Sequence, residues 1–287
     1  MHKTVLLNEV IEGLNLSNKS IVVDATFGGG GHSLGILKRF PKVKIIALDQ
    51  DASVRKSQPG ISFHNENFRN LDEVLKKENV AGIDAIIFDL GLSSDQLENS
   101  GRGFSFMKDE PLLMTLKENP SPEDLTARDV VNTWSEKNLA DIIYGYGEEK
   151  FARRIARGIA EARKKKKIET SFDLVKIIGE AVPAVYKKGR LHFATRTFQA
   201  IRIAVNDELG TLAEGLKKGF KVLRGGGRMA VISFHSLEDR IVKKFYKAKE
   251  KEKEAKLINK KVVVPSSVEI KNNPRSRSAK LRILSRR

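Results

Sequence analysis

The chain has 287 residues, of which 53 are Lys or Arg, 36 are Asp or Glu and 40% are hydrophobic. This length fits one large domain or two unequal ones with a substantial core. The chain contains no Cys, which excludes disulfides, thiolate nucleophiles and Cys-based metal sites and favours a reducing cytoplasm. No apolar run is long enough to predict a membrane span. A net charge of +17 indicates a polyanionic partner, most often a nucleic acid.

Two segments hold the positive charge. Residues 240–287 carry a net charge of +13 and residues 150–167 a net charge of +8, which leaves −4 for the rest. Alternating Lys and Glu over 247–256 are as typical of a solvated helix as of a binding surface. The tail, residues 273–287, is nearly free of acids and alternates basic with apolar residues, as a docked strand does. Because guanidinium groups match phosphate geometry, we expect the tail to contact an RNA or DNA backbone.

The first hundred residues alternate strands and helices. The predicted strands cover residues 20–26, 44–49, 61–64 and 84–90. A helix follows the glycine run at 28–31, and another covers 71–77. The apolar runs are continuous rather than alternating, which is typical of strands covered on both faces of a parallel sheet. The pattern predicts an α/β fold with a Rossmann-like, doubly wound, mainly parallel sheet.

A change of pattern after residue 107, marked by several prolines, predicts an insert. Helices are expected over 121–133, 135–144, 148–163 and 171–181, the first and fourth with Ser caps. One long helix over 196–223 then leads through a glycine turn into a strand at 228–234 and a helix at 237–248. We therefore expect the first part of an α/β domain at 1–107, an all-helical domain at 108–191 and the second part, with the basic tail, at 192–287.

The turn after the first strand carries Asp24 and four glycines, Gly28 to Gly31. The pattern acid-x-small-x-Gly-x-Gly lets the backbone approach a bound cofactor. A dinucleotide fingerprint needs a glycine where Ser33 or Leu34 stands, and a P-loop needs a Gly-Lys pair. The loop therefore disfavours a nicotinamide cofactor. Glycines that serve only packing are the alternative.

Two further strand ends suit an adenosine. Asp49 ends the second strand roughly twenty residues after the loop, where a carboxylate accepts hydrogen bonds from ribose hydroxyls. Capping a helix is the alternative, for which Asp51 is the better candidate. Phe68 follows the third strand and either stacks on an adenine or belongs to the core. Together these residues favour an adenosine-containing cofactor at the carboxyl edge of the sheet, and the form of the loop favours S-adenosylmethionine.

Asp89 ends the fourth strand, with Gln96 at the same rim. An exocyclic amine of a nucleobase is a weak nucleophile because its lone pair is delocalised. A positioned acceptor that holds one N–H turns the lone pair toward the methyl group. Asp89 suits this catalytic role, and it equally suits binding of the cofactor's amino group; a turn residue is the third interpretation.

His235, Glu238 and Asp239 follow the 228–234 strand and either line the substrate cleft or belong to a helix cap at Ser236. The 5 His residues are scattered. They have no metal-binding spacing, and nothing in the acidic residues demands Mg²⁺, so no metal site is expected.

Several stretches resemble the bacterial 16S ribosomal RNA cytosine-N4 methyltransferase H family, also called RsmH or MraW. The most specific are Arg-Gly-Phe-Ser-Phe at 102–106, Thr-Phe-Gln-Ala-Ile-Arg-Ile at 197–203 and Ser-Phe-His-Ser-Leu-Glu-Asp-Arg at 233–240. Weaker matches begin at residues 2–9, and together the blocks run almost end to end.

The resemblance implies methylation of N4 of a cytidine in the decoding centre of 16S rRNA, with S-adenosylmethionine as methyl donor and the small ribosomal subunit as partner. It leaves the oligomeric state open. The family's cofactor contacts map onto Gly30, Gly31, His32, Asp49, Phe68, Asp89 and Gln96. Asp89 is also the catalytic candidate. Since no Cys can add to the cytosine ring, we expect direct in-line transfer.

The chain departs from the family at residues 110–117. Relatives have Gly-Pro-Leu-Asp-Met-Arg-Met-Asp, whereas this chain has Glu-Pro-Leu-Leu-Met-Thr-Leu-Lys. Contacts made by those two acids and that arginine are therefore not carried over. Two alternatives stay open. One is an amino-methyltransferase that acts on another nucleic acid or on protein; the other is a non-catalytic RNA-binding assembly factor with a vestigial cofactor fold.

Overall fold

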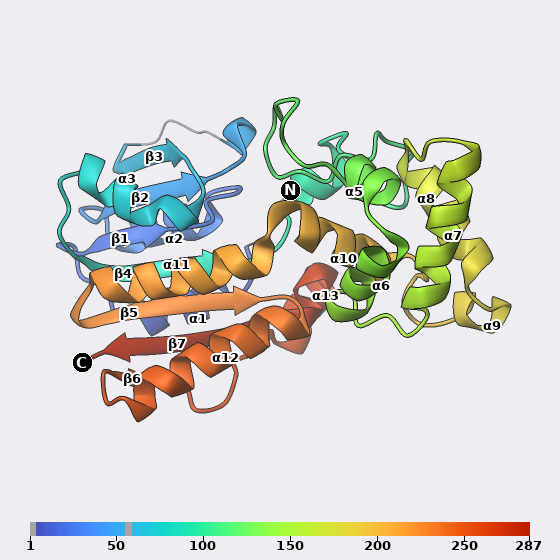
Figure 1. Ribbon diagram of the computed structural model, residues 1–287. Helices are drawn as coiled ribbons and strands as arrows, with labels where there is room; N and C mark the ends of the chain where they lie inside the picture. The colour runs from blue at the N-terminus through green and yellow to red at the C-terminus, as the bar shows by residue number, and fades with distance from the viewer. Residues whose placement is uncertain (1–3, 55–58) are drawn as a thin grey trace. The chain divides into compact units, whose positions relative to one another are not determined.

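The computed structural model describes residues 4–54 and 59–287. The chain forms two compact units, one made of Met1–Ser93 with Leu209–Arg287 and the other of Ser94–Glu208. The first unit carries the sheet, and the second is built from helices (Figure 1). The insert expected at 108–191 lies within the second unit. His2 and Lys3 of the first resemblance block lie outside the described residues.

The first unit contains a 7-stranded sheet in the order β3-β2-β1-β4-β5-β7-β6 (Figure 1). The strands are β1 (Ile21–Asp24), β2 (Lys44–Asp49), β3 (Ile61–Asn65), β4 (Ile83–Asp89), β5 (Leu223–Ser233), β6 (Ala255–Leu257) and β7 (Lys280–Arg286). Neighbours among the first five strands in this order, from β3 through β2, β1 and β4 to β5, pair in parallel. Strand β7 is antiparallel to both of its neighbours, β5 and β6. The predicted Rossmann-like, mainly parallel sheet is confirmed. Its order reverses between β1 and β4, the switch point outside which such sheets bind ligands.

Helices cover both faces of this sheet. On one face lie α3 (Leu71–Lys77), α11 (Glu208–Val222) and α12 (Ser236–Lys251), and on the other α1 (Leu7–Leu14) and α2 (Gly31–Arg39). The consecutive residues Ile86 and Ile87 of β4 belong to the two different cores. Since successive strand residues point to opposite faces, this double burial explains the continuous apolar runs of the sequence.

The second half of the basic C-terminal tail, Lys280–Arg286, forms a strand inside the sheet, as its alternation predicted. Strand β7 lies between β5 and β6. Arg282 Nε donates to Asp239 Oδ1 at 2.7 Å, and Arg286 Nη1 donates to the Lys221 carbonyl at 2.8 Å. At least two of the arginines expected to contact a nucleic acid therefore hold the fold together.

One predicted helix is divided in the structure, and two predicted helix caps are formed by other residues. The helix predicted over 196–223 is two helices, α10 (Thr195–Asn206) and α11, because Asp207 adopts the left-handed region with φ of 46°. The caps predicted at Ser121 and Ser171 are wrong. Thr126 caps α5 (Ala127–Thr133) and Thr170 caps α8 (Ser171–Ala181). Each Thr shares a capping box with an Asp three residues on, which the first-turn acids made available.

The glycine turn predicted at 224–227 is part of β5, which already begins at Leu223. The register between β4 and β5 shifts between Ile83 and Ala85, opposite this run. Glycines within a strand are typical of such irregularities.

The second unit is helical throughout its described regular elements. Its other helices are α4 (Ser94–Glu98), α6 (Glu136–Gly145), α7 (Ala152–Lys165) and α9 (Ala184–Lys187). The elements α6, α7 and α8 pack in succession, and α10 packs on α5 and α6. In the part of the chain that the structure describes, no helix has the length and apolar character needed to cross a bilayer.

Candidate functional site

The ends of β1 and β4 are joined at the switch point of the sheet. The Ala25 N–H donates to the Ile87 carbonyl at 2.9 Å, and the Asp89 N–H donates to Thr26 Oγ1 at 2.6 Å. The glycine loop and Asp89 are thereby brought to one place. Thr26 was not predicted as a site residue, because no local signal says which strands become neighbours.

The glycine loop needs glycine at several positions, because of its backbone conformation or because of neighbouring side chains. Gly28 and Gly30 have φ of 49° and 74°, a region that glycine enters at little cost. A Cβ at Gly31 would lie 1.8 Å from Thr4 Oγ1. A Cβ at Gly30 would likewise lie 2.7 Å from the Phe27 ring. Packing against Thr4 and Phe27 therefore excludes side chains at Gly30 and Gly31, and their contact with a cofactor stays a prediction.

Asp49 braces this loop from the end of β2. Its Oδ2 accepts from the Gly28 N–H at 2.7 Å, and its Oδ1 accepts from the Asp51 N–H at 2.9 Å. Asp51 is buried and accepts hydrogen bonds from Ser53, so Asp51 is the turn-capping acid. The structure thus places Asp49 beside the loop, and the ribose contact stays a prediction.

Phe68 lies largely in the core. The residue is only 9% exposed. Its ring packs edge to face on the ring of Phe88, with the two centroids 5.3 Å apart. A Cβ on Gly215 would lie 2.6 Å from its ring. This packing favours the core interpretation, and stacking on an adenine stays a prediction.

Asp89 is a carboxyl group with an unused acceptor. Its Oδ1 is buried without a hydrogen-bond partner among the described residues. Burial raises the pKa of Asp89 to about 8, with the charges of Asp24 and Glu238 adding to the effect. Burial also raises the pKa of Asp24 to about 6, although Ser33 donates a hydrogen bond to it at 2.6 Å. The strand edge thus gathers carboxyl groups whose ionisation is disfavoured while no cation lies beside them.

His32 connects Asp89 to the N-terminal segment. Its Nε2 lies 3.1 Å from the Val5 carbonyl, and because a carbonyl only accepts, this nitrogen carries the hydrogen. Its Nδ1 lies 3.6 Å from Asp89 Oδ2. The His32 side chain is almost completely buried. Local sequence gave no reason to select His32, since its two partners are distant in the chain; only the family resemblance pointed to it.

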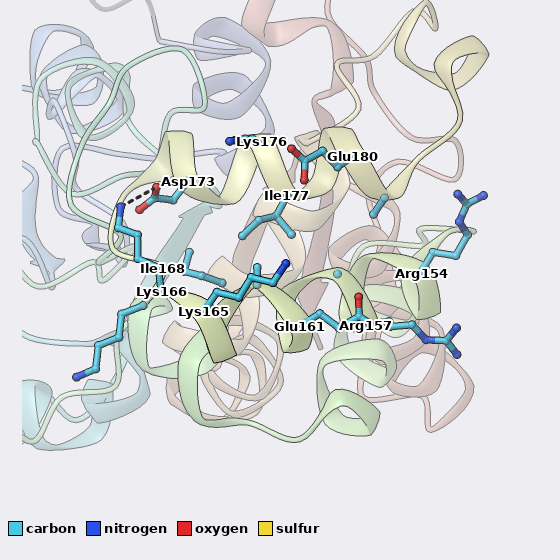
Figure 2. A pocket seen from close by; sticks show the side chains of 14 residues that line it. Arg154, Arg157, Glu161, Lys165, Lys166, Ile168, Asp173, Lys176, Ile177 and Glu180 are labelled. Atoms are coloured by element: carbon cyan, nitrogen blue, oxygen red, sulfur yellow. Dashed lines mark ion pairs between the residues drawn. The ribbon is translucent and has the colours of Figure 1, made fainter.

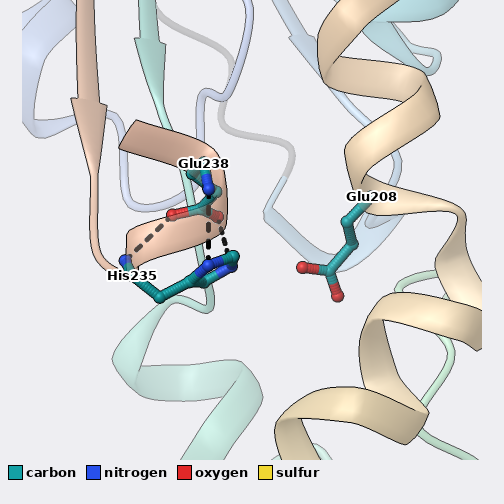
Figure 3. A group of neighbouring side chains, drawn as sticks. All are labelled: Glu208, His235 and Glu238. Carbon is teal, nitrogen blue, oxygen red and sulfur yellow. Dashed lines mark hydrogen bonds and ion pairs between the residues drawn. The ribbon is translucent and has the colours of Figure 1, made fainter. Parts of the chain in front are cut away.

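His235 and Glu238 form the cap of α12 (Figure 3). Glu238 Oε2 accepts from the Phe234 N–H at 2.8 Å, and His235 Nε2 lies 3.2 Å from Glu238 Oε1. The expected cap at Ser236 with Asp239 is wrong, because His235 is the cap residue and Asp239 binds Arg282 instead. Glu238 nevertheless contributes to the site through its charge on Asp89.

Gln96 belongs to the second unit, in α4. It is 8% exposed, and its backbone carbonyl accepts from Ser100 Oγ at 2.6 Å. Its assignment as a cofactor contact stays a prediction.

The segment that departs from the family, residues 110–117, is held inside the second unit. Asn206 Nδ2 donates to the Met114 carbonyl at 2.8 Å, and Asn206 Oδ1 accepts from the Leu116 N–H at 2.9 Å. Arg102 Nη1 donates to the Leu116 carbonyl at 3.0 Å. Lys117, at the position with reversed charge, pairs with Asp124. Of the altered residues, Lys117 thus has a partner of its own, and Thr115 Oγ1 accepts from the Lys117 N–H at 3.3 Å.

Taken together, the edge combines a bare glycine loop, a braced carboxylate and an unpartnered buried acid. The charges of Asp24 and Glu238 both raise the pKa of Asp89 there. Uncompensated buried negative charge is costly unless a cation neutralises it. The site is therefore suited to a ligand with positive charge that approaches the backbone closely.

The sequence matches the family model described as the MraW methylase family over residues 1–287. Curated relatives named "Ribosomal RNA small subunit methyltransferase H" include one from Persephonella marina, 44% identical and covering 99% of each chain. Another, from Sulfurihydrogenibium sp., is 45% identical and covers 98% of each chain. A third, from Limosilactobacillus fermentum, is 42% identical over 99% of this chain and 98% of its own.

Among solved structures, an rRNA methylase from Streptococcus thermophilus covers 100% of this chain and 98% of its own, with a TM-score of 0.45 and 14% identity. That likeness is too remote to inform function.

Proposed function

The chain belongs to the MraW methylase family, and from this premise we propose that it methylates the 16S rRNA of the small ribosomal subunit. The target is the exocyclic N4 of a cytidine in the decoding centre, with S-adenosylmethionine as methyl donor, in the cytoplasm. This proposal is carried by the 42–45% identity, over nearly the full length of the chain, to relatives named "Ribosomal RNA small subunit methyltransferase H".

The residues at the strand edge fit this donor. S-adenosylmethionine carries a sulfonium and an ammonium group, and the carboxyl groups of Asp24, Asp89 and Glu238 lie close enough together at the edge for two of them to raise the pKa of the third. The bare loop at Gly30 and Gly31 would hold the donor against the backbone, and Asp49 would accept hydrogen bonds from its ribose. When bound, S-adenosylmethionine would supply a sulfonium methyl group, which the amine would attack in line so that the sulfur leaves as a neutral thioether.

Asp89 performs the proton chemistry in this proposal. Its Oδ1 accepts an N–H of the cytosine amine, which directs the nitrogen lone pair toward the methyl group, and the carboxylate then takes the proton. A pKa raised to about 8 suits this task because an effective base titrates near the working pH. Positive charge close to Asp89 lowers that pKa and prepares the group to accept.

His32 positions Asp89 rather than reacting itself. Its Nε2–H is committed to the Val5 carbonyl, which fixes the ring and turns Nδ1 toward Asp89 Oδ2. Oδ1 is thereby the oxygen of Asp89 left for the reacting group.

The decisive experiment offers the purified protein intact small subunits, protein-free 16S rRNA and duplex DNA, each with methyl-labelled donor. We expect label in 16S rRNA, at a single cytidine when the product is digested and sequenced. Label found only in DNA or in protein would show that the proposed rRNA substrate is wrong. No binding of S-adenosylmethionine by calorimetry at millimolar concentration would favour the assembly-factor alternative.

A further inference from the structure

The helical unit contains a groove of about 510 Å³ between α7 and α8 (Figure 2). The two helices are joined only by residues 166–170, so they form an antiparallel hairpin. They approach closely at Gly158, where a Cβ would lie 3.5 Å from Ile177 and from Ala181. The floor of the groove is therefore small and apolar, and long charged side chains form its rims.

The rims are predominantly basic. The lining cations are Arg154, Arg157, Lys165, Lys166, Lys167 and Lys176, and the lining acids are Glu161, Asp173 and Glu180. This cation set draws on α7, α8 and their connection. The groove therefore gathers five of the nine cations at 150–167 and adds Lys176, which lies outside that segment.

Two of these cations have no internal task, whereas Arg157 Nε lies 3.7 Å from Glu136 Oε1 and Lys166 pairs with Asp173 at 3.5 Å. Lys165 and Lys176 are exposed and make no ion pair with any residue of the described ranges. By contrast, Arg163 of the same helix donates to the carbonyls of Val131 and Trp134 at 2.9 and 2.6 Å, so it serves the fold. Like charges held together without partners repel one another, and a polyanion in the groove removes this cost.

The spacing of the cations suits a chain of phosphates. Arg154 and Arg157 are neighbours on one face of α7 and point outward at one end of the groove, whereas Lys165 lies between the helices toward the other (Figure 2). Eleven helical residues correspond to roughly 16 Å, about the length of four or five stacked nucleotides at 3.4 Å each. A guanidinium pair also matches phosphate geometry better than ammonium groups do.

We propose that the groove between α7 and α8 binds the phosphate backbone of the RNA substrate, through Arg154, Arg157, Lys165 and Lys176. This inference rests on the proposed function, because it assigns the groove to that same RNA. It assigns the groove affinity and positioning but no part in sequence recognition, since phosphate contacts carry no sequence information directly.

The test compares two double variants of the full-length protein. The groove variant is Lys165→Gln with Lys176→Gln. The matched control is Lys164→Gln with Lys188→Gln, which removes the same charge from the same unit at exposed lysines that do not line the groove. Binding to protein-free 16S rRNA is measured at several salt concentrations, together with the kinetics of methylation and the affinity for S-adenosylmethionine. Thermal unfolding checks that both variants are folded.

Each lost phosphate contact lowers the slope of log K against log salt by about 0.7 to 0.9. We expect the groove variant to lose about 1.5 from this slope and roughly tenfold in RNA affinity, with KM raised, kcat retained and cofactor affinity unchanged. The control variant should lose less than half as much.

Equal slopes in the two variants would overturn the proposal. It would also be wrong if the groove variant lost affinity for intact subunits but not for protein-free rRNA, since the groove would then meet ribosomal protein. A wild-type protein that binds rRNA through the groove but methylates none of the substrates would overturn the proposed function alone.

Discussion

Asp49 Oδ2 accepts a hydrogen bond from the Gly28 N–H at 2.7 Å, which ties the end of β2 to the glycine loop after β1. The acid predicted to bind a ribose thus also determines the shape of the loop. The two tasks make different demands, because an Asn at this position keeps an oxygen acceptor for Gly28 but loses the negative charge.

Replacing Asp49 should therefore weaken donor binding in two distinguishable steps. We expect Asp49→Ala to lower the affinity for S-adenosylmethionine by about 1.5–3 kcal/mol, the range for a lost hydrogen bond to a charged group. Asp49→Asn should recover part of this loss if bracing matters. Calorimetry measures both, and equal affinities for the Asn and Ala variants would show that the loop needs no brace from residue 49.

Asp89→Asn separates catalysis from donor binding. If Asp89 accepts the amine proton, this change should lower kcat by about 10²–10⁴ while changing the affinity for S-adenosylmethionine much less. Single-turnover methylation at saturating donor, alongside calorimetry, measures the two effects. A kcat near wild type with a large loss of affinity would make Asp89 a ligand of the donor only.

The ligand-free protein should lose stability as the pH rises. The folded-state pKa of Asp89 is about 8 and that of Asp24 about 6, both above the ordinary 3.8. The folded state therefore binds these protons more tightly, and their stabilisation is complete below about pH 4 and is lost as the pH approaches 8. Because part of the Asp89 side chain is exposed, we expect a decrease of a few kcal/mol at most, at roughly 1.4 kcal/mol per pKa unit.

Denaturant unfolding between pH 4 and pH 9 measures this dependence. Asp89→Asn should flatten the part between pH 6 and 8, whereas the exposed control Asp141→Asn should leave the curve unchanged. Stability that rises over this range would show that Asp89 is stabilised as a carboxylate.

Gly103, inside the block at 102–106 that resembles the family, and Gly101, just before that block, offer a matched pair. Both have positive φ, of 73° and 66°, but a Cβ on Gly103 would lie 2.5 Å from the Pro111 carbonyl oxygen, whereas nothing lies within 4 Å of one on Gly101. Gly101→Ala should lower the stability by about 1 kcal/mol from backbone strain. Gly103→Ala should lower the stability by about 1–3 kcal/mol more than Gly101→Ala does, because of overpacking. Thermal or denaturant unfolding of both variants measures this difference. Equal losses in the two variants would contradict the predicted clash.

Arg282 and Asp239 test whether the tail serves the fold. Their side chains are 16% and 14% exposed. Removing one partner leaves a partly buried charge, so Arg282→Ala should destabilise by about 1–3 kcal/mol. The double variant with Asp239→Ala should lose less than the sum of the single variants. Strictly additive losses would contradict a structural role for this pair. An Arg282→Ala protein of normal stability with weakened RNA binding would show that Arg282 contacts the nucleic acid.

The sequence by itself determined the parallel sheet and the acids at its edge. Continuous apolar runs such as 85–88 are typical of strands buried on both faces, and the carboxyl ends of parallel strands meet at one edge. Asp49 and Asp89 were therefore predictable as neighbours of the glycine loop. Local propensity also predicted α3 at its observed bounds, since its apolar residues Leu71, Val74 and Leu75 follow the helical period.

Tertiary structure decided which polar groups are satisfied. The contact of His32 with Val5 and Asp89, and the bond from Asp89 to Thr26, join residues far apart in the chain, so no local pattern encodes them. The same reason explains the tail. Its arginines look like a nucleic-acid contact in the sequence, yet Arg282 and Arg286 find acceptors on α12 and near the end of α11. Only the fold shows which cations remain free, and in the α7–α8 hairpin these include Lys165 and Lys176.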